Sequence, residues 1–265
     1  KLLEDAPSAS TSALLLPGFI CKQSTSVHVY DNLSITNIPP PLDGSGWQSL
    51  RWCRVERCPK ILTVFHTPRG SERLQLFKLL RTFWASQLPM ACYIWNWSTT
   101  YQPSVGSFEY LVLLHLDNCP RLKHVLPLSN LMDTLPSLET LEIVCCGDLK
   151  EVFPLDPKRQ EKHEIIKFPN LKRIHLYQLS TLQGICGSRM SAPNLETIKI
   201  RGCWSLKCLP AVSGNNEKLP SVDCEKEWWD NLEWDGLNKY HHPSLYEPSH
   251  SLYYKAELPR GTILR

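Results

Sequence analysis

The sequence of 265 residues contains no apolar run long enough to cross a lipid bilayer. The longest apolar stretch near its start, ALLLPGFIC at residues 13–21, contains a proline and lacks the basic lead of a signal peptide. We therefore expect no membrane span. Because the chain begins at Lys1 and not at a methionine, we expect a fragment of a longer polypeptide, and a targeting signal could lie upstream.

Neither sign of charge dominates the chain. It has 29 lysines and arginines against 26 aspartates and glutamates, and the formal net charge is +3. Proteins that bind nucleic acids or anionic membranes carry clusters of basic residues. In this chain the basic residues are scattered along the sequence. We therefore expect no nucleic-acid partner. With 42% hydrophobic residues, the chain is long and apolar enough to fold around a sizeable core.

The signatures of several enzyme and metal-binding classes are also missing. The sequence has no C-x-x-C pair, no G-x-S-x-G nucleophile motif and no H-E-x-x-H metal motif. Histidines on a binding surface could in principle perform acid–base chemistry, but no nucleophile stands beside them. We expect a protein that is not an enzyme and that needs no cofactor or metal ion.

Eleven cysteines are an odd number, and their spacing does not indicate a compact disulfide framework. This pattern favours a reducing compartment. Two glycosylation-type sequons, at Asn32 and Asn96, argue the other way, but so short a motif also occurs by chance. We expect a cytoplasmic protein, and glycans on either asparagine in the native host would overturn that expectation.

The sequence does contain an internal repeat. Its pattern is L-x-x-L-x-L-x-x-C/L-x-x-L, and clear copies begin at Leu50, Leu111, Leu138, Leu171 and Leu195. Weaker copies begin at Ser24 and Leu219, and an ambiguous one begins at Leu88. Most of the intervals between copies lie within or close to the range of leucine-rich repeats, and the long ones carry insertions.

Alternation within each copy places two apolar residues, such as Ile198 and Ile200, on one face of a short strand. One such strand cannot bury its apolar face alone, so successive copies must stack. We therefore predict an α/β leucine-rich-repeat solenoid. Short parallel strands form its concave face, and irregular or helical connections form its convex side.

Cysteine recurs at position nine of the copies, where leucine-rich repeats place asparagine or cysteine. The residues are Cys58, Cys119, Cys146 and Cys203. A small, weakly polar side chain there can turn into the coil and meet backbone groups. The alternative is a zinc or redox pair, because Cys53 and Cys58 repeat the spacing of Cys203 and Cys208. The two pairs occupy different repeat positions, so we interpret these cysteines as structural.

The chain divides into an N-terminal edge (1–23), the repeats (24–227) and a C-terminal cap and tail (228–265). Helical spacing of apolar residues predicts a convex helix near 71–86, which could alternatively bind a partner. The charged segment 154–167 predicts an exposed loop. Trp228, Trp229 and Trp234 predict an aromatic cap, with a ligand-stacking surface as the alternative.

Residues between the buried positions of each strand must point out of the concave sheet. Position five supplies His28, Arg54, His115, Glu142, His175 and Lys199. Position seven supplies Tyr30, Glu56, Asp117, Val144, Tyr177 and Arg201. Mixed charges, histidines and tyrosines favour contact with a protein, although any one of these residues can be an ordinary surface side chain. Apart from Val144, we take these residues as the candidate binding face.

Several segments together resemble the C-terminal leucine-rich-repeat region of plant intracellular nucleotide-binding disease resistance proteins, especially the coiled-coil class of cereals. They are LPSLETLEIVCCGDLKEVFP, FPNLKRIHLYQLSTLQGIC, APNLETIKIRGCWSLKCLP and CEKEWWDNLEWDG. The resemblance extends from about residue 24 to the C-terminus. It implies a module that recognises a pathogen effector or a guarded host protein, and that restrains a nucleotide-binding domain of the same receptor.

The sequence has no G-x-x-x-x-G-K-[ST] phosphate loop, so we expect any nucleotide-binding domain to lie upstream. A different interaction scaffold, such as a substrate receptor of a ubiquitin ligase, is the alternative, because such receptors also use leucine-rich repeats. Extracellular repeat receptors are a further alternative, but the glycine-isoleucine-proline motif usual in their repeats is absent.

Overall fold

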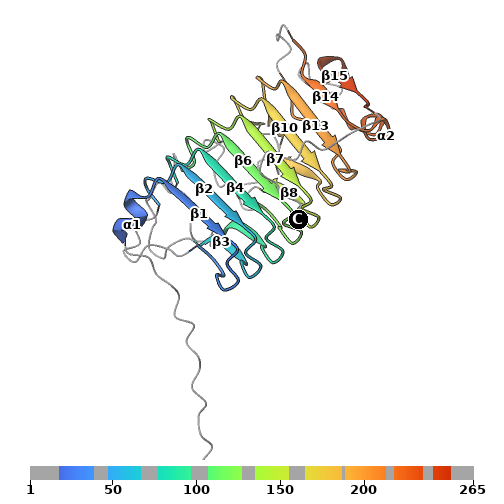
Figure 1. Cartoon of the computed structure of the whole chain (residues 1–265). Helices are drawn as coiled ribbons and strands as arrows, with labels where there is room; N and C mark the ends of the chain where they lie inside the picture. The colour runs from blue at the N-terminus through green and yellow to red at the C-terminus, as the bar shows by residue number, and fades with distance from the viewer. Residues whose placement is uncertain are drawn as a thin grey trace, which may run out of the picture.

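The structure is a computed structural model that describes residues 18–38, 47–66, 77–96, 107–126, 135–154, 165–186, 189–212, 218–234 and 241–251. Nine strands form one parallel sheet that runs the length of the molecule (Figure 1). In spatial order they are β1 (Ser26–Tyr30), β2 (Trp52–Glu56), β4 (Thr82–Ser86), β6 (Leu113–Asp117), β7 (Thr140–Val144), β10 (Arg173–Tyr177), β13 (Thr197–Arg201), β14 (Ser221–Asp223) and β15 (Glu247–Ser249). The predicted solenoid is confirmed.

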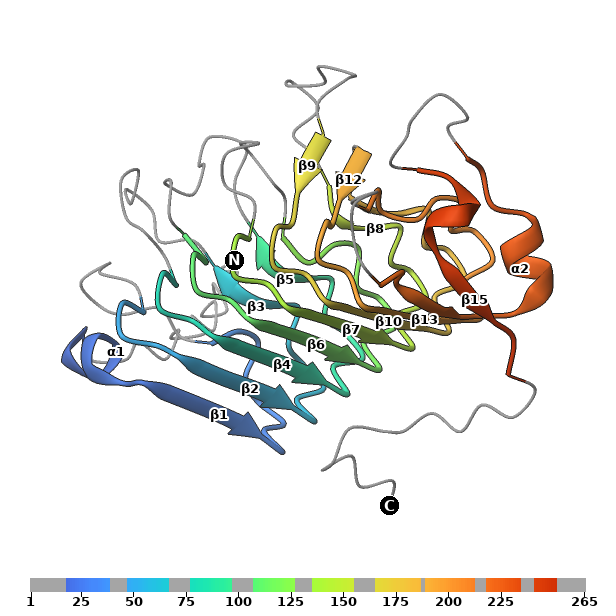
Figure 2. The same ribbon diagram turned by 90° about the horizontal axis from the view of Figure 1, so that it is seen from above.

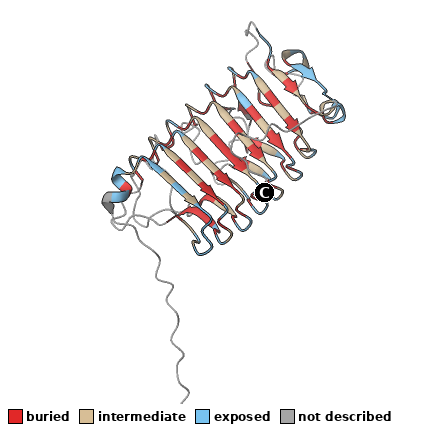
Figure 3. Cartoon of the chain, viewed as in Figure 1, coloured by how far each residue is buried: buried red, intermediate tan, exposed pale blue. Residues whose placement is uncertain are grey.

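Positions three to seven of each copy form the strand, and positions four and six point into the core. In β13 these are Ile198 and Ile200, both fully buried. Ile198 pairs in register with Ile174 of β10, and Ile200 pairs with Leu176, so equivalent residues stack in continuous layers. Figure 3 shows the resulting alternation of buried and half-buried residues along the strands. Each coil buries its apolar face against its neighbours.

The first seven strands of the sheet, β1 to β13, are each followed by a residue with a left-handed backbone at position eight. The positive-φ residues here are Asp31, Arg57, Gln87, Asn118, Cys145, Gln178 and Gly202, with φ between 50° and 65°. The backbone N–H of each of these residues except Gly202 donates to the carbonyl of the last residue of the next strand, which adds one hydrogen bond to the sheet. For example, the Cys145 N–H donates to the Tyr177 carbonyl at 2.9 Å. At Gly202 the Glu225 carboxylate accepts instead, at 2.8 Å.

The position-nine thiols turn into the coil as predicted. Cys58 donates to the Glu56 carbonyl at 3.2 Å, and Cys203 lies 3.5 Å from the carbonyls of Arg201 and Leu176. Cys119 and Cys146 make the equivalent contact within their own copies. All four are fully buried, so the predicted placement of these thiols is confirmed.

The predicted helix near 71–86 is wrong where the structure describes it. Thr82–Ser86 is strand β4, which pairs with β2 and β6, and residues 71–76 lie outside the described residues. The missed copy begins at Leu80, so the predicted copy from Leu88 is also wrong, since Leu88 is position nine of this one. Phe83 and Ala85 point into the core while Trp84 points out, which gives the segment strand as well as helical spacing.

The side opposite the main sheet carries short parallel strand pairs (Figure 2). They are β3 (Thr63–His66) with β5 (Tyr93–Asn96), β8 (Glu151–Phe153) with β11 (Gly184–Cys186), and β9 (Ile165–Lys167) with β12 (Arg189–Ser191). Residues 155–164 of the predicted charged loop lie outside the described residues, and its end, Ile165–Lys167, is β9. Among the described residues, irregular segments and these short strands form most of the convex connections, and a helical connection, α2 (Lys226–Asp230), occurs between β14 and β15.

Helices occur at the two ends of the described chain: α1 (Gly18–Gln23), α2 (Lys226–Asp230) and the 3-10 helix η3 (Pro243–Leu245). Among the described residues, no helix is long and apolar enough to cross a membrane. Residues 1–17 of the predicted N-terminal edge and residues 252–265 of the predicted tail lie outside the described residues.

Aromatic residues cover the C-terminal end of the stack. Trp228 is buried and its indole N–H donates to the Leu206 carbonyl at 2.9 Å. The rings of Trp229, Trp234 and Tyr246 contact one another, and the Tyr246 hydroxyl donates to the Pro210 carbonyl. Since β15 pairs in parallel with β14, the sheet continues beyond the domain boundary predicted at residue 228.

Candidate functional site

The side chains at positions five and seven lie on the concave face of the sheet, opposite the core. Each of the candidate residues belongs to a strand of the nine-stranded sheet, and equivalent positions pair directly across neighbouring strands, as His115 does with Glu142 and Glu142 with His175. Parallel pairing in one register therefore brings residues that are far apart in the sequence into two rows. Polar contacts join many of them.

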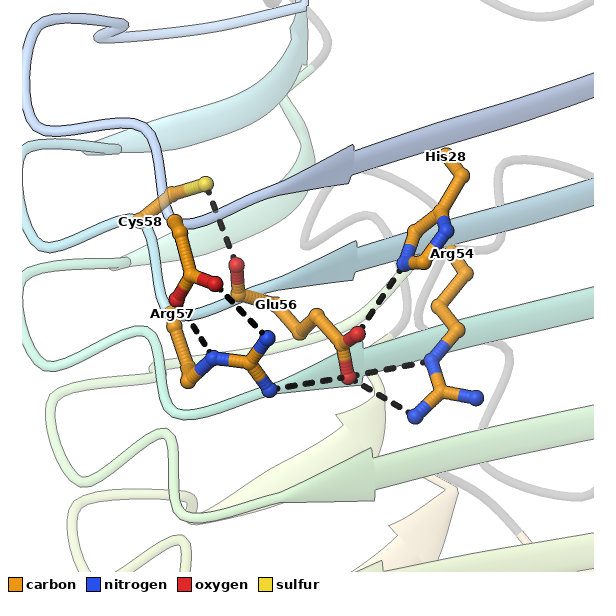
Figure 4. Close-up of polar contacts among 6 residues, drawn as sticks. His28, Arg54, Glu56, Arg57 and Cys58 are labelled. Atoms are coloured by element: carbon orange, nitrogen blue, oxygen red, sulfur yellow. Dashed lines mark hydrogen bonds and ion pairs between the residues drawn. The ribbon is translucent and has the colours of Figure 1, made fainter. Parts of the chain in front are cut away.

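Glu56 is the centre of an ionic cluster at the N-terminal end of this face (Figure 4). Its Oε2 accepts from Nε and Nη2 of Arg54 at 3.0 and 2.8 Å, and its Oε1 lies 3.0 Å from Nε2 of His28. Arg57 adds a longer ion pair at 3.7 Å and also binds Asp31. Burial alone would raise the pKa of Glu56, but these cationic and hydrogen-bonding partners outweigh it and lower the pKa.

Trp84 continues the row beyond this cluster. The Arg54 guanidinium carbon lies 5.0 Å from the centre of the Trp84 ring, a cation–π contact. On its other side, the Trp84 ring stacks on His115, with centroids 3.6 Å apart. Trp84 is absent from the predicted face, because helical spacing of the apolar residues predicted a helix for its segment. The signal that could have found it is the alternation of Phe83 and Ala85 around it.

Glu142 bridges two histidines in the middle of the face. Its two carboxylate oxygens lie 2.9 Å from Nδ1 of His115 and 3.0 Å from Nδ1 of His175, on the strands to either side. Hydrogen bonds from both histidines outweigh the effect of burial and lower the pKa of Glu142 to about 2. The carboxylate is therefore ionised at neutral pH and ties three strands together.

Arg201 and Lys199 occupy the C-terminal end of the face. Arg201 donates to the Asp223 carboxylate at 2.6 Å and to the Ser251 hydroxyl at 2.9 Å, and its side chain is only 11% exposed. Lys199 is half-buried, and within the described part of the chain its amine has no hydrogen bond or ion pair. Of these two cations, Lys199 is the more available to a partner.

Three of the candidate residues do not project into solvent as expected. His115 is fully buried, and Glu56 and Tyr177 are 6% and 8% exposed. Neighbouring side chains cover them, as Trp84 covers His115. Tyr30, in contrast, is 56% exposed. Asp117 is half-buried, and burial raises its pKa, partly offset by the nearby His115.

Position three adds residues to the face beyond the predicted positions five and seven. Trp52 and Arg173 lie on the same strand face as positions five and seven, and Trp52 meets the His28 ring edge-on at 5.8 Å. The same alternation that selected positions five and seven also selects position three. Across the described residues, no group of three or more His, Cys, Asp or Glu side chains is arranged to hold a metal ion. Ion pairs, stacked rings and half-exposed aromatic side chains make this face suited to contact with another macromolecule.

Comparison with known proteins bears directly on the repeats. Residues 80–219, just over half of the chain, match the sequence model of the family described as "Plant disease resistance protein RPS2-like, leucine-rich repeats". Among curated proteins of Arabidopsis thaliana, the disease resistance protein SUMM2 is 30% identical over 52% of this chain, and the disease resistance protein RPS5 is 25% identical over 52%. Protein SUPPRESSOR OF npr1-1, CONSTITUTIVE 1 is 32% identical over 51%.

These alignments span 15%, 15% and 8% of the length of the respective relatives, so they concern one region of much longer proteins. No solved structure matches the chain. The narrower expectation of the coiled-coil class of cereals stays a prediction. The family match contains five of the nine strands of the main sheet, namely β4, β6, β7, β10 and β13. The chain therefore belongs to the RPS2-like leucine-rich-repeat family of plant disease resistance proteins.

Proposed function

We propose that the chain is the recognition module of a plant immune receptor, and that its concave face binds a pathogen effector or a host protein altered by one. The observation that carries the proposal is the continuous row of charged and aromatic side chains from His28 to His175 on that face. Membership of a disease resistance family supports its use in defence.

In this proposal the module acts by binding and not by catalysis. It restrains a nucleotide-binding domain of the same receptor until the partner is recognised, and it works in the cytoplasm. A partner that binds one conformation of the receptor more tightly than another shifts the population of receptors toward the conformation that it binds more tightly. Ion pairs that link neighbouring strands preorganise the concave face, which lowers the entropy cost of binding.

The test uses affinity purification from leaves that express the chain and are challenged with pathogens. A concave double variant, Tyr30→Glu with Lys199→Glu, alters two residues outside the Glu56 and Glu142 ion-pair clusters. A matched control, Leu62→Glu with Lys167→Glu, makes the same kinds of change outside the nine-stranded sheet, at exposed residues. Thermal unfolding first establishes that both variants are folded.

The proposal expects at least one pathogen or host protein that co-purifies with the unmodified chain and with the control variant. Its recovery with the concave variant should fall by about tenfold or more, as for the loss of interface hot spots. If the concave variant and the control variant recover the same proteins in equal amounts, the concave face is not the recognition surface.

A further inference from the structure

Two arginines at the start of neighbouring strands stand out because their charges are not balanced. Arg51 and Arg81 precede β2 and β4, and the Arg81 N–H donates to the Arg51 carbonyl at 2.7 Å, so the two residues lie side by side. Both are exposed. Within the described ranges, neither guanidinium has an ion pair or a hydrogen bond.

The equivalent residues before β7 and β10, Glu139 and Lys172, are arranged differently. Lys172 donates its backbone N–H to the Glu139 carbonyl at 2.9 Å, which is the backbone relation of Arg81 to Arg51. There, however, the side chains carry opposite charges and form an ion pair at 3.2 Å. Like charges directly opposite one another on paired strands are unfavourable. The solenoid thus carries at Arg51 and Arg81 a repulsion that it avoids at Glu139 and Lys172.

The carboxylates described at the C-terminal ends of β1 and β2, and before β6, are already engaged by other cations. Glu56 is held by Arg54, Arg57 and His28, as Figure 4 shows, and Asp31 is bound by Arg57. Glu109, which precedes β6, pairs with Lys78 at 3.3 Å. The face at the N-terminal end of the sheet therefore keeps an uncompensated positive charge at Arg51 and Arg81.

Aromatic side chains lie on β2 and β4, the strands that follow the two arginines, and on the neighbouring β1. Trp52 directly follows Arg51 and is half-buried, and Trp84 is half-buried under the Arg54 guanidinium. Tyr30 lies at the opposite end of β1 from the arginines and is 56% exposed. Its ring lies 4.7 Å from that of His28, which Trp52 also meets edge-on at 5.8 Å. Tryptophan, tyrosine and arginine are the residues most enriched where binding energy concentrates in protein interfaces. Apolar stacking surface and free positive charge thus occur together on three adjacent strands.

We infer that this acidic-segment patch, formed by Tyr30, Arg51, Trp52, Arg81 and Trp84, binds a segment of the partner protein that combines carboxylates with apolar or aromatic side chains. The carboxylates neutralise Arg51 and Arg81, and the apolar side chains cover the exposed parts of Trp52 and Tyr30. This inference rests on the proposed function, since it specifies the chemistry of the partner. Charge complementarity also speeds the encounter and excludes basic partners.

The test is a selection of random dodecapeptides displayed on phage against the full purified chain. We expect enriched peptides to carry acidic residues beside aromatic or aliphatic ones. Their affinity should fall about tenfold or more with Arg51→Glu/Arg81→Glu and with Trp52→Ala, in line with hot-spot substitutions. A matched control, Lys167→Glu, reverses an exposed cation outside the nine-stranded sheet, in β9, and should leave the affinity unchanged.

Arg51→Gln/Arg81→Gln keeps the test independent of folding, because it removes the repulsion between the arginines and should weaken binding without lowering the unfolding temperature. The inference is overturned if no peptide is enriched, if neutral or basic peptides are enriched, or if acidic peptides bind the arginine variants as well as the unmodified chain. It is also overturned if a single-stranded oligonucleotide competes as well as the peptides, since the patch would then recognise any polyanion. None of these results changes the outcome of the leaf purification, because neither arginine is altered in that experiment. The proposed function can therefore hold even if this inference fails.

Discussion

Position eight of each copy places a left-handed backbone on residues other than glycine in six of the seven coils where it is seen. A residue with a Cβ atom loses about 1–2 kcal/mol in this conformation. Glycine avoids that cost but gives up more chain entropy on folding. The sequence of the repeat therefore contains residues whose replacement by glycine is favourable, and one glycine whose replacement is not.

Gly202→Ala should lower the free energy of unfolding by about 1–2 kcal/mol, because φ is +65° and the new Cβ would lie 3.0 Å from the Gln178 side chain. Cys145→Gly, at φ 53°, should raise it by up to about 1 kcal/mol. Urea unfolding measures both. Cys208→Gly, outside the positive-φ positions, serves as the control, and an equal gain there would contradict the explanation.

The buried thiols at position nine should not react with an alkylating reagent in the folded chain. Burial raises the pKa of Cys203 to about 12, while Cys145 and Cys208 are exposed. We expect iodoacetamide at pH 8 to modify the two exposed cysteines of the folded chain, and to reach Cys203 only after unfolding. Peptide mass spectrometry of a time course measures the rates. Modification of Cys203 as fast as Cys208 would mean that the turn is open or the thiol is activated.

Between elements, Glu142 is the side chain that links β6, β7 and β10. The pKa of its carboxyl is lowered to about 2 from an ordinary 4.5, so the folded state gains stability that is complete above pH 4.5. That stability is lost as the pH falls from 4.5 toward 2. With allowance for solvent screening at a half-buried group, the contribution is about 2 kcal/mol.

Unfolding of the chain and of Glu142→Gln should therefore be compared between pH 2 and pH 6. The unmodified chain should be the more stable of the two at pH 6, and the difference should shrink as the pH falls toward 2. Glu196→Gln, an exposed glutamate, provides the control. A difference between the chain and Glu142→Gln that does not change with pH would show that the carboxylate is not stabilised by the two histidines.

Most strands of the sheet could be predicted from the sequence. The same pattern of apolar positions recurs in every copy of the repeat, so one copy supports the assignment of the others. β4 and β15 are the exceptions. β15 lies in the segment predicted as cap and tail. In β4, the inward positions hold Phe83 and Ala85 in place of leucine, and aromatic residues at this spacing fit a helix as well as a strand. Its neighbours determine the outcome, since β2 and β6 each need a paired strand between them. The copy from Leu80 also evens the spacing, with starts 30 residues after Leu50 and 31 before Leu111.

The sequence predicted which residues form the two rows of the candidate face, but not which of these residues contact one another. Alternation places Glu142 and His175 outward, yet only the register between strands joins them through one carboxylate. Burial was the harder part, because whether His115 is covered depends on Trp84, a residue of a different strand. Sequence periodicity therefore finds a surface, while the packing decides which of its side chains a partner can reach.

At the scale of the whole molecule, stability is a sum over neighbouring coils, so damage at one end should stay local. Trp228→Ala removes a buried indole and its hydrogen bond to Leu206, at a cost of about 3–5 kcal/mol. We expect hydrogen exchange to speed up in β13 and β14 and to stay unchanged in β2. Uniform loss of protection along the sheet would instead indicate a single cooperative unit.

The most direct measurement is photo-crosslinking of the purified chain in extracts of challenged leaves. A benzophenone side chain replaces Tyr30 or Lys199 on the concave face, or Leu62 or Lys167 outside the main sheet. If the concave face recognises a partner, the first two positions form covalent adducts with the same protein and the other two do not. Adducts from all four positions alike, or only from Leu62 and Lys167, would contradict the proposal that this face is the recognition surface.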